Sequence, residues 1–130
     1  MLIIFYPIVA IIRTKDYYRE MIDFLQNYQS IIHYSLHFLV PGLLAFVLFK
    51  KIWKKAWLVL VATMLVDLDH LWANPLFDPE RCSIGFHFLH TPYAIIGYFL
   101  LLYVPNKWFK IAAIGLLFHM LTDYIDCMLM

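Results

Sequence analysis

The segment AWLVLVATMLVDLDHLWAN, residues 56–74, decides the fold of this chain. At 1.5 Å per residue it is long enough to cross a hydrocarbon core about 30 Å thick. Residues 56–66 carry no charge, but Asp67, Asp69 and His70 follow at once. Each ionisable group inside a spanning helix costs about 2.5–3.5 kcal/mol, so it needs a partner or a function. The segment therefore predicts a membrane-crossing helix that carries part of a polar site.

Three further apolar stretches of this kind lie at 31–49, 88–104 and 108–130. The chain is 64% hydrophobic and 15% charged, with a net charge of +1, whereas a soluble domain is about half apolar and a quarter charged. It also lacks the basic stripe of a nucleic-acid-binding protein. We predict an all-α polytopic membrane protein, a four-helix transmembrane bundle forming one domain over residues 1–130, with no nucleic-acid partner.

Lysines mark one side of the predicted bundle. They fall in the loops between the first two spans and between the last two: Lys50, Lys51, Lys54, Lys55, Lys107 and Lys110. Cytoplasmic loops collect Lys and Arg, so this side is expected to face the cytoplasm. The 75–87 loop, the C-terminus and residues 1–30 fall on the other side. Residues 1–12 are apolar but too short to span, and residues 17–28 alternate as an amphipathic helix that we expect at the membrane surface.

All six histidines and four of the acids accompany the predicted spans. His33 and His37 open the first span, four residues apart and hence on one helix face. The remaining clusters are Asp67, Asp69 and His70 in the second span, His87 and His90 at the start of the third, and His119, Asp123 and Asp126 in the fourth. By their depth along each helix, all of these groups lie in the membrane half away from the lysines. One polar centre is therefore predicted.

Imidazole and carboxylate are the ligands of zinc and of iron or manganese sites in helical bundles. We predict one or two divalent ions, Zn²⁺ first and Mn or Fe as alternatives. The predicted ligands are His37, Asp67, His70, His90, His119 and Asp123. Asp67 is the preferred bridging carboxylate, and His33 and His87 are further ligands or hydrogen-bond partners of ligands. On an ideal helix Asp69 points about 160° away from Asp67, so it needs a helix break or a partner elsewhere.

Cys82 and Cys127 are the only cysteines, and both map to the side away from the lysines. In an oxidising compartment they can form a disulfide that joins the loop to the end of the fourth span. Two free thiols or a thiolate ligand are the alternatives.

The four clusters resemble a family of small bacterial inner-membrane proteins, the membrane-bound metal-dependent hydrolases, and within it a branch of short four-span proteins. The matching motifs are His37 with Phe38-Leu39-Val40, then Leu65-Val66-Asp67-Leu68-Asp69-His70, His90-Thr91, and His119-Met120-Leu121-Thr122-Asp123. The likeness covers about residues 33–126. The chain departs from the family's His-Arg-Gly-x-Thr-His before the third span, where it has Gly85-Phe86-His87-Phe88-Leu89-His90. The resemblance implies a multi-pass protein of the bacterial inner membrane and a hydrolytic activity.

Together these features predict a metal-dependent hydrolase acting on a phosphoester or ester of a lipid or lipid-linked molecule. Asp69 or Asp126 would serve as general base, and Arg81 would orient an anionic head group. The bilayer and this substrate are the predicted partners, and the oligomeric state is left open. The alternatives are a transition-metal or cation carrier, and a structural protein whose bundle is clamped by a metal.

Overall fold

The computed structural model describes residues 17–76, 78 and 81–130, and every regular element among them is a helix. Residues 17–27 are helical. They are followed by α2 (Gln29–Leu48), η1 (Lys50–Ile52), α3 (Trp53–Ala62), η2 (Thr63–Trp72), η3 (Phe88–His90), α4 (Pro92–Leu101) and α5 (Lys107–Leu129). The η elements are 3₁₀ helices. The apolar stretch 1–12 lies outside the described residues.

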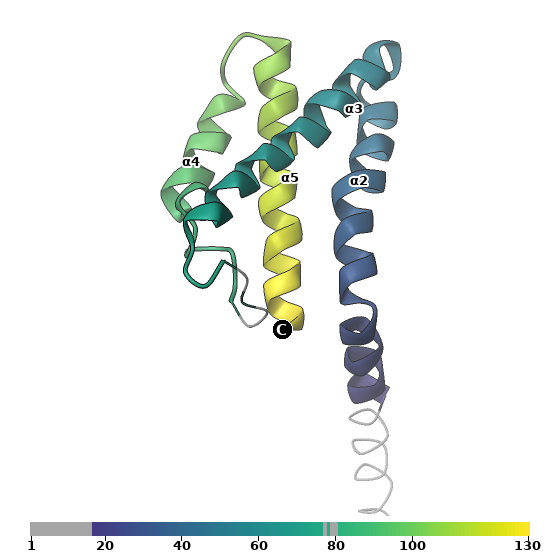
Figure 1. Ribbon diagram of the computed structural model, residues 1–130. Helices are drawn as coiled ribbons and strands as arrows, with labels where there is room; N and C mark the ends of the chain where they lie inside the picture. The colour runs from purple at the N-terminus through teal and green to yellow at the C-terminus, as the bar shows by residue number, and fades with distance from the viewer. Residues whose placement is uncertain (1–16, 77, 79–80) are drawn as a thin grey trace, which may run out of the picture.

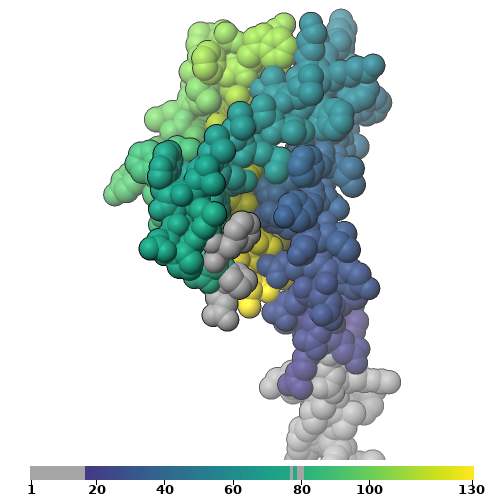
Figure 2. Space-filling model, in the orientation of Figure 1, coloured from purple at the N-terminus to yellow at the C-terminus, as the bar shows by residue number. Residues whose placement is uncertain are grey.

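Helix α5 is the centre of the arrangement, since it contacts α2, α3, η2 and α4. In Figure 1, α2 and α5 run along the long axis of the molecule, α3 crosses them obliquely, and α4 lies on the other side of α5. The space-filling view shows the middle of α5, in yellow, between the teal atoms of α3 and η2 and the blue atoms of α2 (Figure 2).

The apolar core lies between α2, α3 and α5 and contains Ala45, Ala56, Leu60 and Ile111. Small residues let these helices approach closely. A Cβ placed on Gly115 of α5 would come within 2.7 Å of Thr63 Oγ1 and 2.8 Å of Thr63 Cγ2. Gly115 is therefore required for the close contact between α5 and the start of η2.

The second predicted span changes its helical type half-way. At the junction the Thr63 hydroxyl donates to the Leu60 carbonyl at 2.6 Å, a back-bond that often bends helices. A 3₁₀ helix has three residues per turn, so Thr63, Val66 and Asp69 form one buried stripe. With a rise of about 2.0 Å per residue in η2 and 1.5 Å in α3, the two together are about 35 Å long.

Two helices, α2 and α5, are long and apolar enough to cross a membrane. The third predicted span, 88–104, is shorter than expected, because it is divided into η3 and the ten-residue α4. The break falls at Thr91, which precedes Pro92 and is extended with ψ 157°. A residue before proline is pushed out of the α region, and the Thr91 hydroxyl then accepts a hydrogen bond from Ala94 N to start α4.

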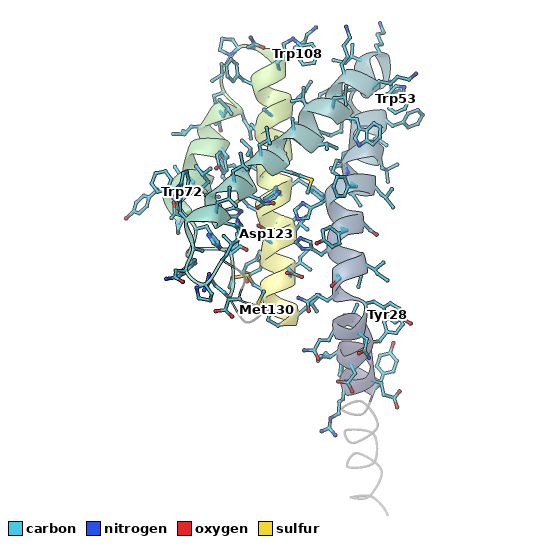
Figure 3. All side chains as sticks on the ribbon, viewed as in Figure 1. Tyr28, Trp53, Trp72, Trp108, Asp123 and Met130 are labelled. Carbon is cyan, nitrogen blue, oxygen red and sulfur yellow. A yellow bond between two sulfur atoms is a disulfide. The ribbon has the colours of Figure 1, made fainter. Side chains whose placement is uncertain are left out.

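The two lysine-rich loops lie at the same end of the molecule, as predicted. Figure 3 shows Trp53 and Trp108 together at this end and Met130 at the opposite end. The 17–27 helix leads directly into α2, because the Tyr28 amide donates to Phe24 O at 3.1 Å and the Ile32 amide to Tyr28 O at 2.9 Å. Gln26 Nε2 also donates to Leu129 O at 3.0 Å, so this segment contacts the end of α5.

Candidate metal centre

Four buried or half-buried side chains converge in the half of the molecule away from the lysines. Asp67 comes from η2, His90 from η3, and His119 and Asp123 from α5, one helical turn apart. Asp123 lies in the lower half of α5 in Figure 3. His90, His119 and Asp123 are 0%, 2% and 4% exposed. One ligand atom from each of the four residues lies within 4.8 Å of the others.

The individual distances define a compact polyhedron. Asp67 Oδ1 is 3.0 Å from His119 Nε2 and 3.3 Å from His90 Nε2. Asp123 Oδ2 is 3.1 Å from His90 Nε2 and 3.3 Å from His119 Nε2, and the two Nε2 atoms are 3.4 Å apart. A tetrahedral ion with ligand bonds of 2.0–2.2 Å would place its ligand atoms about 3.4 Å from one another. The four atoms therefore fit one divalent ion.

Asp69 orients His90 toward this centre. Its Oδ2 lies 3.2 Å from His90 Nδ1 and accepts a hydrogen bond from Leu89 N at 2.7 Å. A carboxylate can only accept, so His90 donates through Nδ1 and a neutral ring keeps its Nε2 lone pair for the centre. This is the carboxylate–histidine arrangement that accompanies most metal-bound histidines.

Asp123 faces two groups of histidines with its two oxygens. While Oδ2 faces His90 and His119, Oδ1 lies 3.4 Å from His37 Nε2. His33, His37 and Asp123 form a second group that could hold a metal ion. Asp67, the predicted bridging carboxylate, contacts its neighbours through Oδ1. Asp123 is the carboxylate whose two oxygens face both groups.

Several ligand atoms of the two groups have no hydrogen-bond partner among the described residues. They are His33 Nδ1, His37 Nε2 and Asp123 Oδ2, all buried. An unpaired buried polar atom costs about 1–3 kcal/mol. The centre is thus under-satisfied by protein groups alone, which fits a bound cation.

His70 lies beside the centre and is bonded to other groups. Its Nδ1 is 3.7 Å from Asp67 Oδ1 but 3.1 Å from Asp69 Oδ1, and its Nε2 is 3.1 Å from Ser83 Oγ. The His87 ring stacks on it with centroids 3.7 Å apart and an interplanar angle of 22°. Burial, together with the neighbouring His70, lowers the pKa of His87. Asp69, His70 and His87 form the third group able to hold a metal ion.

The remaining predicted residues lie further out. Asp126 Oδ1 accepts a hydrogen bond from Gln29 Nε2 at 2.9 Å, and its Oδ2 is 3.7 Å from His33 Nδ1. Arg81 donates to Pro75 O at 2.8 Å and to Asp78 Oδ2 at 3.2 Å, so its guanidinium holds its own loop together. Its predicted contact with a head group stays a prediction.

Asp69 differs most from its predicted role. We named it with Asp126 as a candidate general base, but both of its oxygens already accept hydrogen bonds and its side chain is fully buried. On an ideal α-helix Asp69 would point about 160° away from Asp67, and the 3₁₀ geometry of η2 is the departure from that helix. It turns Asp69 toward η3, away from the Asp67 face.

The structure contains the disulfide between Cys82 and Cys127, with the Cα atoms 5.0 Å apart. It ties the 81–87 loop to α5 one turn beyond Asp123. Ser83 and Gln29, which contact His70 and Asp126, were missed by the sequence argument. The one signal in the sequence for Ser83 is that it directly follows Cys82, whose predicted disulfide would fix this part of the loop.

Comparison with known protein families identifies the family to which the chain belongs. A sequence model described as a family of unknown function (DUF6122) matches residues 27–130. The chain belongs to this family. The DUF6122 match covers every candidate ligand, from His33 to Asp123. No curated protein and no solved structure matches the chain.

Proposed function

We propose that this protein is a four-span bacterial inner-membrane hydrolase whose His/Asp metal centre lies in the non-cytoplasmic half of the bundle. Its proposed substrate is a phosphoester or ester of a lipid or lipid-linked molecule. The single observation that carries the proposal is the convergence of Asp67, His90, His119 and Asp123 at ligand-to-ligand distances of 3.0–3.4 Å.

The membrane arrangement is supported by lengths and charges. Helices α2 and α5 pass the test of length and hydropathy, and α3 with η2 is about 35 Å long by its helical rise. Helix α4 is shorter and would cross together with η3 and the residues that flank it. Both lysine-rich loops lie at one end, which the positive-inside rule assigns to the cytoplasm.

The residues around the centre have separate tasks. Asp67, His90, His119 and Asp123 would hold the ion, which we propose to be Zn²⁺ because two imidazoles and two carboxylates suit it. When bound, the ion would act as a Lewis acid that polarises an ester or phosphoryl oxygen. Asp69 keeps His90 in the correct tautomer, and we infer that the second group, with His37, takes a second ion through the shared Asp123.

Asp126 is the better placed of the two predicted bases. It lies between α2 and α5 beside Gln29, His33, Leu36, Thr122 and Leu129, where the helices pack without space for a water molecule. Asp126 accepts a hydrogen bond through Oδ1, and its Oδ2 lies 3.7 Å from His33 Nδ1, so Oδ2 is left to accept a proton. Both oxygens of Asp69, in contrast, already accept hydrogen bonds. The centre lies in the half of the molecule away from the lysines, the half that we propose to be in the outer leaflet, and this supports a lipid or lipid-linked substrate.

The structural alternative is a bundle clamped by a metal or by imidazolium–carboxylate pairs. It has support because the ligands come from three elements, η2, η3 and α5, which such contacts would hold together. The carrier alternative has less support. A conducting path would have to continue toward the lysine end, where Ala45, Ala56, Leu60 and Ile111 fill the space between helices.

Metal analysis of the purified protein tests the proposal. We expect at least one equivalent of Zn²⁺, lost in Asp123→Asn and in His119→Ala but kept in Asp23→Asn, a matched change at an exposed acid. Turnover of lipid-linked phosphoesters or esters should disappear on chelation and return with Zn²⁺. Stoichiometric metal without turnover of either class supports the clamp, and absence of metal from a folded protein contradicts the centre itself.

A further inference from the structure

Asp69, His70 and Ser83 form a hydrogen-bonded series beside the metal centre. Asp69 Oδ1 lies 3.1 Å from His70 Nδ1, and His70 Nε2 lies 3.1 Å from Ser83 Oγ. The carboxylate can only accept, so the proton of a neutral His70 is on Nδ1. Its Nε2 is then an acceptor, and Ser83 is the donor. This is the order of groups that activates a serine hydroxyl in acyl transfer.

The series is fixed on all sides. Asp69 is held by the Leu89 amide at 2.7 Å, and the His87 ring covers one face of His70. The carbonyl of Ser83 accepts from the amides of Phe86 and His87, both at 3.2 Å. A serine on a tight, anchored turn keeps its hydroxyl in one place, as a nucleophile requires.

The hydrogen bonds of His70 distinguish it from the metal-facing histidines. Each of its ring nitrogens has a partner within hydrogen-bond distance, whereas His37 Nε2 has none among the described residues. His37 Nε2 is therefore left for the proposed cation, while His70 already donates to Asp69 and accepts from Ser83.

We propose that Ser83 is the nucleophile of an acyl-transfer step on a carboxylic ester, with His70 as its base and Asp69 as the residue that positions His70. This rests on the proposed hydrolase function and narrows its substrate class. Ser83 Oγ bonds to the carbonyl carbon, the bond from that carbon to the alcohol oxygen breaks, and the serine proton passes through His70 Nε2 to the leaving alcohol. Water then hydrolyses the acyl-serine and restores the hydroxyl.

The surroundings of Ser83 suit an ester with a long apolar chain. Phe86, whose amide bonds to the Ser83 carbonyl, is 56% exposed, and Phe88 is 77% exposed. Ser83 itself is half-buried. In the proposed topology it lies in the outer half of the membrane, near the level at which the acyl esters of outer-leaflet lipids adjoin their head groups. The Ser83 hydroxyl is thus hydrogen-bonded to His70 beside the polar centre, in a segment that carries exposed aromatic side chains.

A fluorophosphonate probe tests this on the full chain, purified in detergent with its disulfide intact. We expect a covalent adduct that peptide mass spectrometry locates at Ser83. Ser83→Ala should lose it and Ser35→Ala, a matched change in α2, should keep it. His70→Ala should slow labelling at least 100-fold, as expected when the base of such a series is removed. Wild type should also release p-nitrophenol from p-nitrophenyl butyrate with an initial burst that Ser83→Ala lacks.

Two results would overturn the inference: no adduct at Ser83 in folded protein, or an adduct whose rate is unchanged in His70→Ala. The first would leave Ser83 as a residue that fixes the tautomer of His70. Folding of each variant is verified by the absence of maleimide-reactive thiols, since Cys82 adjoins Ser83. Metal content measured on the same samples separates this test from the proposed metal centre: labelling without metal refutes the centre, and metal without labelling refutes the nucleophile.

Discussion

Asp69 is the residue that links the parts of the site. Its two carboxylate oxygens meet three donors, on His70, His90 and the Leu89 amide. One side chain therefore positions a predicted metal ligand and a predicted base at once. No sequence rule assigns both tasks to one acid.

Asp69→Asn changes the chemistry of this position without changing its size. The amide retains one accepting oxygen and presents an NH₂ group to the other donors, so His90 is no longer held in its tautomer. We expect metal affinity to fall by about 10–100-fold, measured by competition with a chromogenic chelator. Asp23→Asn serves as the control, and an unchanged affinity in Asp69→Asn would show that His90 does not depend on this carboxylate.

At this scale the sequence predicted the residue types and their shared depth but not the atoms in contact. His90, His119, Asp67 and Asp123 could be grouped because charged groups in an apolar chain must find one another. Which oxygen of Asp123 faces which histidine depends on side-chain torsions and on the close α5–η2 contact. These arise from packing, which a helical projection does not contain.

Among the elements, η2 departs furthest from expectation. The apolar stretch 56–74 predicted one α-helix, because hydropathy and length do not distinguish α from 3₁₀ geometry. The change from α to 3₁₀ geometry at Thr63 places Asp69 in the buried stripe with Thr63 and Val66. The lengths of α2 and α5 agreed with prediction to within a few residues, since apolar runs bounded by polar loops are strong signals.

The close contact between α5 and η2 predicts that alanine substitutions at two glycines, Gly115 and Gly97, have different effects on stability. Gly115→Ala would drive a methyl group against the Thr63 side chain, and we expect a loss of stability of about 1–3 kcal/mol. A Cβ on Gly97 of α4 would meet nothing within 4 Å, so Gly97→Ala should be neutral or stabilising by up to about 1 kcal/mol.

Unfolding in mixed micelles as SDS is titrated would measure both variants. Thr63→Ser in the Gly115→Ala background removes the methyl group and should restore part of the loss. Equal stability of the two glycine variants would show that α5 and η2 are not as closely packed as described.

For the molecule as a whole, the positions of the loops predict the topology. Reporter fusions after Lys51 and after Asn106 should report the cytoplasm, and fusions after Asp78 and after Met130 the opposite side. Green fluorescent protein and alkaline phosphatase give opposite signals on the two sides. A cytoplasmic signal from the Asp78 fusion would invert the proposed orientation and place the disulfide in a reducing compartment.

The Cys82–Cys127 disulfide joins positions 45 residues apart, so it restricts the unfolded chain strongly. We expect the double variant Cys82→Ser, Cys127→Ser to lose about 2–4 kcal/mol of stability. The same SDS titration, with and without a reductant on wild type, measures this loss. If reduction leaves wild type unchanged, the bridge contributes nothing to stability and its function is confined to the loop.

The position of α5 also sets the order in which the protein can mature. His119 and Asp123 follow Asp67 by 52 and 56 residues, and Cys127 follows Cys82 by 45. The ligand set and the bridge can therefore close only after α5 has been synthesised, and until then Asp67 of η2 lacks its partner His119 from α5. Oxidation of the two thiols and binding of the proposed cation therefore both depend on the same short stretch of α5, residues 119–127.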